Sequence, residues 1–121
     1  MKIVVVDDSR AMRMIVVRTL RQAGFGGHEV LEAENGREGL ELVAEHGPDL
    51  ILSDWNMPEL SGIEFLQILR ARGNATPFCF VTSEGSQEMR EQAAAAGALG
   101  LIAKPFTAES FSDVLSTVVT P

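Results

Sequence analysis

Apolar residues along the chain gather in five short runs, which are separated by segments with helical periodicity. These runs cover residues 3–6, 29–33, 50–53, 78–81 and 99–103. The first, third and fourth are almost continuously apolar, which is typical of strands covered on both faces of a parallel sheet. The second mixes acidic and apolar residues, as an outer strand does. The pattern therefore predicts five short strands.

Each segment with helical periodicity begins at a residue that favours a helix N-cap. The predicted N-caps are Ser9, Asn35, Ser61, Ser86 and Thr107. A glutamate stands three residues after Ser61, which is a capping box, and three after Asn35, which is its asparagine variant. Gly24 and Gly97 follow the first and fourth of these segments as helix ends. Five helices are therefore expected.

The apolar spacing assigns a buried face to these helices. The predicted buried stripes are Met12, Ile15, Val16, Thr19 and Ala23; Leu40, Val43 and Ala44; Phe65, Leu66 and Leu69; and Phe111, Val114, Leu115 and Val118. The fourth helix differs, because it is rich in alanine over 93–96 and carries Met89 as its main large apolar residue. A small buried area makes it a candidate mobile element, although an ordinary helix that packs through small residues has the same composition.

Strand and helix alternate five times, with short connections between them. This order predicts a doubly wound α/β sandwich with a five-stranded parallel sheet, and right-handed crossovers leave few topologies. A length of 121 residues corresponds to one domain. We therefore expect a single domain over residues 1–121, without an output domain.

Acidic residues stand where the first and third apolar runs end. Asp7 and Asp8 follow the first run, and Asp54 follows the third. Ligands of open α/β sheets bind at the carboxyl ends of the strands, where the strand order reverses, so these acids predict one shared site. A hard divalent cation such as Mg²⁺, which prefers oxygen ligands, would relieve the repulsion among them. The alternative is a set of solvated loop acids that bind nothing.

Hydroxyl and ammonium groups follow the fourth and fifth apolar runs. Thr82 and Ser83 offer hydroxyls, and Lys104 offers a cation, at the same edge of the predicted sheet as the acids. This combination suits phosphoryl transfer, in which an aspartate carboxylate can itself be the nucleophile. Each of these residues taken singly also fits a helix cap or a surface side chain, so the prediction depends on the combination.

Four sequence motifs resemble the receiver domains of two-component response regulators. They are VVDDSRAMR at 5–13, LSDWNMP at 52–58, VTSE at 81–84 and LIAKPF at 101–106. The resemblance covers the whole chain and is strongest to free-standing chemotaxis regulators of the CheY type. It implies a flavodoxin-like (βα)5 fold with strand order 2-1-3-4-5, for which flavodoxin and CheY are standard examples. The order then reverses between strands 1 and 3, where the acids stand.

The resemblance also implies roles for the residues around the metal. Asp54 would be the phosphoacceptor, which takes a phosphoryl group from a histidine kinase, and would also bind the metal. Asp8 would bind Mg²⁺ directly, and Asp7 would hold one of its water molecules. Asn56 would offer its backbone carbonyl. Asn56 and Glu84 match the family positions that tune the rate of dephosphorylation.

The other implied roles concern the phosphoryl group. Thr82, with Ser83 beside it, would donate a hydrogen bond to that group after its side chain moves inward, and Lys104 would pair with it. The bond from Lys104 to Pro105 would be cis. Leu101 stands where family members often carry Tyr or Phe as a rotameric switch, so an aromatic toggle is absent. Either Leu101 makes a smaller movement, or the coupling depends on Thr82 and the loop after it.

Composition narrows the range of partners. A net charge of -7, from 17 acidic and 10 basic residues, argues against nucleic acid as the main partner. The apolar runs are much shorter than the roughly 20 residues that span a bilayer, so no membrane association is expected. The single cysteine, Cys79, lies in an apolar run and is expected to be a buried, inert thiol, which fits a cytoplasmic protein. We expect a monomer in the unphosphorylated state.

The sequence therefore predicts a phosphorylation-activated signalling switch, with a chemotaxis pathway as its expected setting. It would catalyse only its own phosphorylation and dephosphorylation, and would not be an enzyme otherwise. A protein target would bind the face formed by the fourth helix, fifth strand and fifth helix. From residue 84 onward the acids are Glu84, Glu88, Glu91, Glu109 and Asp113, against Arg90 and Lys104 as the only bases. Regulators of the flagellar motor tend to carry lysines on this face, so the motor switch is one candidate target among others.

Three alternative functions stay open. The chain could be a phosphate sink or phosphorelay receiver without a motor target, a Mg²⁺-dependent aspartyl-phosphate phosphatase acting on small molecules, or an interaction domain that keeps only the fold. Trp55 is expected to be a partly exposed ring beside the site, useful as a fluorescent reporter. His28 and His46 are expected to be surface residues without a ligand role.

Overall fold

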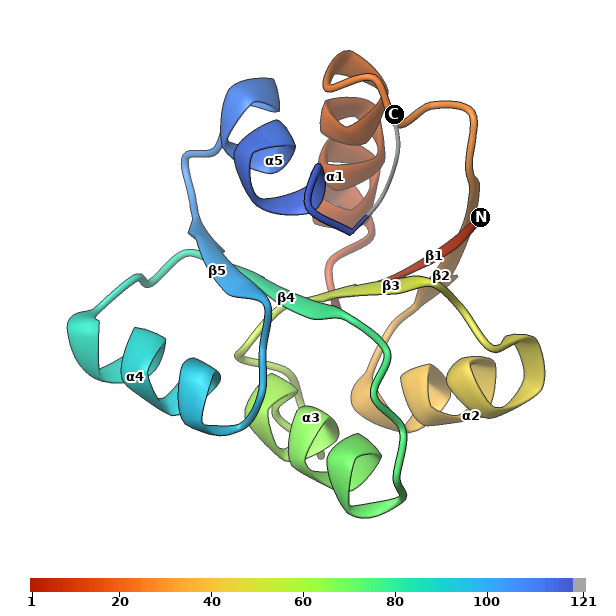
Figure 1. Cartoon of the computed structure of the whole chain (residues 1–121), viewed down its shortest axis with the longest axis vertical. Coiled ribbons are helices and arrows are strands. Elements are labelled where there is room, and N and C mark those ends of the chain that lie inside the picture. Colours follow the sequence, from red (N-terminus) through yellow and green to blue (C-terminus); the bar gives the residue numbers. More distant parts are fainter. Residues whose placement is uncertain (119–121) are drawn as a thin grey trace.

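Residues 1–118 fold into five strands and five helices that alternate along the sequence (Figure 1). The computed structural model describes residues 1–118. The strands are β1 (Lys2–Val6), β2 (Glu29–Ala33), β3 (Leu50–Ser53), β4 (Phe78–Thr82) and β5 (Gly100–Ala103). The helices are α1 (Arg10–Gln22), α2 (Gly36–His46), α3 (Gly62–Ala71), α4 (Gln87–Ala95) and α5 (Ala108–Leu115). Each strand begins and ends within one residue of its predicted bounds.

The sheet has the order β2-β1-β3-β4-β5, and every neighbouring pair is parallel. Figure 1 shows α1 and α5 on one face of the sheet and α2, α3 and α4 on the other. The predicted flavodoxin-like sandwich is therefore confirmed. Each face has its own apolar cluster, because both faces are covered by helices. Within residues 1–118, no helix is both long enough and apolar enough to cross a membrane.

All five predicted N-caps are confirmed. In each helix the side chain of the cap accepts a backbone N–H three residues further on, which satisfies one of the free donors at the start of the helix. Ser61 and Glu64 form the predicted capping box. The side chain of Asn35 accepts the N–H of Glu38 at 2.9 Å and donates to the Glu38 carboxylate at 3.2 Å. These local bonds set where each helix begins after its strand.

The buried face of α1 differs from the prediction. Its buried residues are Arg13, Val16, Thr19 and Leu20. Ile15, which was expected to be buried, is 38% exposed. Arg13 occupies an inner position because its guanidinium finds polar partners there. Ala44 of α2 is likewise exposed, whereas the predicted stripes of α3 and α5 are confirmed.

Cys79 lies in β4 and is buried, as predicted. Burial raises the pKa of its thiol from 9.0 to about 12. Its Sγ donates to the carbonyl oxygen of Phe80 at 3.5 Å. Because the thiolate is the reactive form of cysteine, this thiol is inert in the folded chain.

Gly62, the first residue of α3, packs directly against the loop that carries Asp54. Its N–H donates to the carbonyl of Trp55 at 2.8 Å. A Cβ atom on Gly62 would overlap the carbonyl oxygen of Asp54. Only glycine therefore lets α3 approach this loop so closely.

Replacing Gly62 with alanine should destabilise the fold by about 1–3 kcal/mol, because the added methyl group forces the backbone at Asp54 to move. Gly27→Ala is the matched control, since nothing lies within 4 Å of a Cβ atom at that position. Urea unfolding followed by circular dichroism measures both variants. Equal stability of the two would contradict the close approach of α3 to the loop.

Candidate functional site

Three carboxylates meet at the carboxyl edge of the sheet, from Asp7, Asp8 and Asp54. One oxygen of each lies within 4.8 Å of those of the other two. They meet because β1 and β3 pair with Val6 opposite Ser53, so the residues that follow reach the same edge. The backbone N–H of Asp54 donates to the carbonyl of Val6 at 2.9 Å, which ties the two strand ends together. The acids thus lie together where the strand order reverses.

Burial raises the pKa of Asp7 and of Asp54 above the ordinary value of 3.8. For both carboxyls the loss of solvation is the largest cause, and the neighbouring acids raise the pKa further. Hydrogen bonds oppose this, because Asp7 accepts the N–H of Ser9 and Asp54 accepts the N–H of Trp55, each at 2.8 Å. The ammonium of Lys104 also lowers both pKa values. The cluster is therefore a costly place for negative charge when no cation is bound.

Lys104 is the basic side chain of the site. Its Nζ lies 3.9 Å from Oδ2 of Asp7, and both side chains are largely buried. The backbone N–H of Lys104 donates to the carbonyl of Thr82 at 2.8 Å, so the ends of β4 and β5 are joined. The Lys104–Pro105 bond is cis, as the resemblance implied. The cation is thus brought to the acids by the backbone of β5.

Thr82 is the last residue of β4 and Ser83 follows it, and the two side chains have different environments. Thr82 is completely buried, and its hydroxyl accepts the N–H of Glu84 at 3.3 Å. Ser83 and Glu84 are exposed. The Thr82 hydroxyl is therefore the enclosed one, and it is bonded to the start of the loop that leads into α4.

Asn56 and Leu101 lie in contrasting places. Asn56 is exposed, and its backbone N–H donates to Asp54 and lowers the pKa of that carboxyl. Leu101 is 7% exposed, pairs with Phe80 across β4 and β5, and belongs to the apolar cluster that includes Ala93 of α4. The predicted switch residue Leu101 therefore lies in the core, away from the carboxylate cluster.

Trp55 was expected to be partly exposed, and this prediction is wrong. Its side chain is buried, with 9% exposure, and its ring lies 4.6 Å from that of Phe80 at an angle of 41°. Its backbone N–H still donates to the Asp54 carboxylate. The ring turns inward because Phe80 of β4 offers an aromatic face, which sequence spacing does not reveal.

Arg13 is a residue of the site whose role sequence reasoning missed. Its Nη1 donates to the backbone carbonyl of Asp7 at 2.6 Å, and its Nε pairs with Glu32 of β2 at 3.0 Å. The guanidinium therefore holds the backbone from which Asp7 and Asp8 project. The sequence contained one indication of this role. Arg13 lies near the N-terminus of α1, where the helix dipole disfavours a cation unless it has a partner.

The residues at this edge fit a hard divalent cation. Three carboxylates that share a small space, two of them with a raised pKa, gain from a positive charge among them. Oxygen is the ligand that Mg²⁺ prefers, and Mg²⁺ commonly uses one or two carboxylates together with water. The donor set and its electrostatics thus agree with a magnesium site.

Comparison with known proteins places this chain in a family. Residues 3–116 match the response regulator receiver domain, and the chain therefore belongs to that family. Receiver domains are phosphorylation-dependent signalling switches that generally bind Mg²⁺ at an acidic pocket. A receiver domain of this type implies a histidine kinase as phosphodonor and a downstream target.

The relatives of the chain include CheY proteins. Chemotaxis protein CheY-3 of Vibrio cholerae serotype O1 is 38% identical over 120 residues, which are 98% of this chain and 91% of the relative. The probable chemotaxis protein CheY of Rhizobium etli is 34% identical over 119 residues, 97% of this chain and 91% of the relative. The solved structure of Vibrio cholerae CheY4 matches with a TM-score of 0.85 at 38% identity and covers 98% of both chains. The chain is thus a receiver domain of the CheY type.

Asp54→Asn should stabilise the chain in Mg²⁺-free buffer at neutral pH, on the order of 1 kcal/mol, because it removes one charge from the cluster. A raised carboxyl pKa means that the folded chain holds the proton more tightly than the unfolded chain. Stability from this group is present below the ordinary pKa and is lost as the pH rises through the raised one. The extra stability of Asp54→Asn over the natural chain should therefore decrease at acidic pH. Saturating Mg²⁺ should remove it, because the cation offsets the repulsion in the natural chain.

Urea unfolding over a pH series measures this effect. Asp113→Asn is the control, since it removes the same charge from an exposed position on α5. A gain for Asp54→Asn that persists at acidic pH, or that Asp113→Asn reproduces, would contradict repulsion within the cluster as its cause.

Arg13→Met should weaken Mg²⁺ binding by about tenfold or more, because residues that position metal ligands commonly have effects of this size. Glu32→Gln should have a smaller effect, since it keeps an oxygen acceptor for Arg13. Titration of Mg²⁺ followed by Trp55 fluorescence gives the affinity, and urea unfolding without metal gives the stability. Lower stability with an unchanged affinity would mean that Arg13 supports the fold and not the metal site.

Proposed function

We propose that this chain is a phosphorylation-activated switch of a two-component chemotaxis system, in which Asp54 accepts a phosphoryl group from a histidine kinase. One observation carries the proposal. A partly buried Asp54 carboxylate shares the edge of the sheet with two further acids, and the ammonium of Lys104 lies 3.9 Å from one of them, Asp7, and lowers the pKa of Asp54. Such a place disfavours negative charge in the resting state and favours the arrival of a divalent cation and a phosphoryl group together.

The two oxygens of Asp54 have different surroundings. Oδ1 accepts the N–H of Trp55, and the N–H of Asn56 also donates to this carboxylate. We propose Oδ2, which does not bond the Trp55 N–H, as the nucleophile. Oδ2 attacks the phosphorus of a phosphohistidine, the new P–O bond forms, and the P–N bond breaks with its electron pair returning to the imidazole. Lys104 then pairs with a phosphoryl oxygen, and the Thr82 hydroxyl donates to another.

The metal would be held by Asp8 directly, by Asp7 through water, by Asp54 and by the backbone carbonyl of Asn56. Mg²⁺ in that place supplies charge neutralisation for the phosphoryl oxygens. The side chains of Asn56 and Glu84 are exposed, and we propose that they control the access of water and so the rate of dephosphorylation.

Thr82 offers a physical link from the site to α4. Its hydroxyl now accepts the N–H of Glu84, in the loop that leads into α4. When that hydroxyl turns to donate to the phosphoryl group, its bond to Glu84 is lost or weakened. We propose that the loop over residues 83–86 then moves and carries the start of α4 with it.

Helix α4 is held by few buried apolar side chains, with Met89 only partly buried against the core, which suits a mobile element. Ala93 is its one buried residue among those described. Arg90 donates to the carbonyls of Gly85 at 3.3 Å and Leu101 at 3.1 Å, and Arg70 donates to Gly97 just beyond the helix at 3.0 Å. Few buried apolar contacts mean a low free energy of local rearrangement. Leu101 is already buried, and Arg90 of α4 donates to its backbone carbonyl. We propose that this bond couples α4 to β5, so that no aromatic switch residue is needed.

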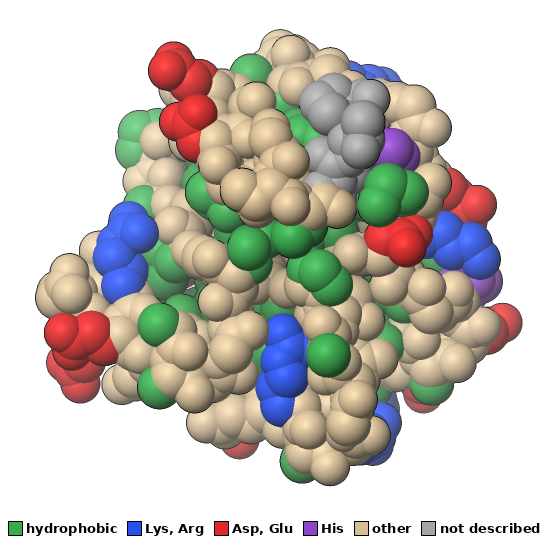
Figure 2. All heavy atoms as spheres, in the orientation of Figure 1, with side chains coloured by type: hydrophobic (Ala, Val, Ile, Leu, Met, Phe, Trp, Pro, Cys, Tyr) green, Lys and Arg blue, Asp and Glu red, His purple; other side chains and the backbone are tan. Residues whose placement is uncertain are grey.

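The α4–β5–α5 face is proposed to bind the downstream target, and its charge indicates the target's chemistry. Its exposed acids are Glu84, Glu88, Glu91, Glu109 and Asp113. Figure 2 shows acidic side chains over α5 and over the N-terminal end of α4. This charge favours a basic target segment over an acidic one. A flagellar motor switch fits only if its docking segment is basic. We further propose that the chain acts in the cytoplasm and is monomeric before phosphorylation.

Mg²⁺ should change Trp55 fluorescence, and beryllofluoride added afterwards should cause a second change, because the Trp55 backbone is bonded to the Asp54 carboxylate. Asp54→Asn should abolish the second change. Lys104→Met should weaken the response to beryllofluoride about tenfold or more, through loss of the cation that pairs with the anion.

Two results would contradict the proposal. A fold intact by circular dichroism that gives no response to millimolar Mg²⁺ would favour an interaction domain without phosphorylation. Turnover of a small phosphate ester at many equivalents per chain would favour an aspartyl-phosphate phosphatase.

Beryllofluoride with Mg²⁺ should alter amide hydrogen exchange several-fold in residues 83–98, because α4 is held by few buried apolar contacts. Exchange in α2 and α3 should change little. Mass spectrometry of peptic fragments measures both, and Asp54→Asn is the control that should show no difference. A uniform change across all helices, or a change confined to residues 54–60, would contradict α4 as the mobile element.

A further inference from the structure

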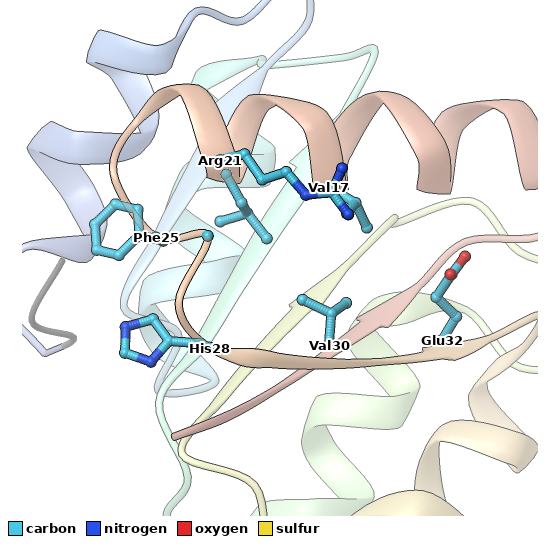
Figure 3. A pocket seen from close by; sticks show the side chains of 8 residues that line it. Val17, Arg21, Phe25, His28, Val30 and Glu32 are labelled. Atoms are coloured by element: carbon cyan, nitrogen blue, oxygen red, sulfur yellow. The ribbon is translucent and has the colours of Figure 1, made fainter.

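A groove lies between α1 and the edge strand β2, and none of the carboxylates at the site lines it (Figure 3). It consists of two adjoining hollows of about 250 and 410 Å³. Val17, Arg21 and Glu32 line both hollows, which makes them one continuous surface. Figure 3 shows Val17 and Arg21 coming from α1 and Val30 and Glu32 coming from β2 on the opposite wall.

The walls of the groove carry apolar side chains that are incompletely covered. Met14, at one end, is 60% exposed, and Val17 and Val30 are half-buried. Val30 points to the α1 side of β2, whereas its neighbour Leu31 packs on the α2 side. Large exposed apolar side chains beside a concave surface are typical of a docking site for another molecule.

The charge of this surface is opposite to that of the chain. The chain carries -7 overall, yet α1 contains four arginines, Arg10, Arg13, Arg18 and Arg21, and no acid. Arg18 and Arg21 are exposed, and neither side chain has a hydrogen bond or ion pair within residues 1–118. Glu32, on the other wall, is neutralised by its ion pair with Arg13. The groove therefore presents two unpaired guanidinium groups beside apolar side chains.

We propose that the groove between α1 and β2 is a docking site for an acidic segment of a protein partner. A large apolar side chain of the segment lies between Val17 and Val30, and its carboxylates pair with Arg18 and Arg21. This site is separate from the acidic α4–β5–α5 face, so one chain binds two partners of opposite charge. Docking here needs neither Mg²⁺ nor phosphorylation.

Other occupants fit this surface less well. Binding to an anionic membrane surface typically uses clusters of about four to eight basic residues, and this groove offers two unpaired ones. A concave surface can also accommodate a protruding side chain of a partner, whereas it is poorly shaped for insertion into a bilayer. The net charge of -7 opposes the long-range approach of nucleic acid.

Selection from a phage library of random peptides on the unphosphorylated full-length chain tests the proposal. The enriched peptides should contain an excess of Asp and Glu and at least one large apolar residue. A synthetic copy of one of them, measured by fluorescence anisotropy, should bind the double variant Arg18→Glu, Arg21→Glu about tenfold or more weakly. Met14→Ala and Val17→Ala should weaken binding at unchanged salt dependence.

The double variant Arg37→Glu, Arg72→Glu is the matched control. It changes net charge by the same amount at exposed positions in α2 and after α3, and it should bind the peptide almost as the natural chain does. Equal weakening by both double variants would overturn the proposal, as would enrichment of basic or neutral peptides. Binding to phosphatidylserine-containing vesicles that is lost only in Arg18→Glu, Arg21→Glu would also overturn it, in favour of a membrane surface.

Discussion

Repulsion among carboxylates that are held partly out of water is the interaction on which the rest of this structure depends. The pairing of β1 with β3 brings Asp7 and Asp54 to one edge, and burial raises the pKa of both. A site of this kind favours the binding of a cation even before phosphorylation. The proposed metal affinity follows from that preference, and the bound cation would in turn allow the proposed phosphoryl acceptance. Gly62 packs closely against the loop that carries Asp54, so the backbone at Asp54 has little room to move towards α3.

The two basic side chains near the acids have different functions. One positions the backbone that carries the acids, and the other offsets their negative charge. Arg13 bonds a backbone carbonyl, so it fixes where the acids project, whereas Lys104 lies against a carboxylate and offsets its negative charge. An arginine suits the first task because its planar group binds two acceptors at fixed angles. A lysine suits the second, because its compact charge can shift from a carboxylate to an incoming phosphoryl oxygen. The two residues are therefore not interchangeable.

Charge is unevenly distributed over the folded chain, and this shapes its range of partners. Four arginines and no acid lie on α1, next to the edge strand, while α4 and α5 each carry two exposed acids. Helix α4 is fixed by guanidinium-to-carbonyl bonds and by little apolar area, so its position can respond to changes at the strand ends. A face that responds to the site and a face that is independent of it can then serve different partners.

The sequence by itself determined the strands, the helix starts and the set of acids, because each depends on neighbours within a few residues. Apolar runs mark strands buried on both faces, and the caps bond N–H groups three residues away. Tertiary structure alone decided that Trp55 turns inward onto Phe80, that Ile15 faces outward and that Arg13 bonds the backbone of Asp7. The partners that decide these orientations lie on other elements, and sequence periodicity carries no information about which elements meet.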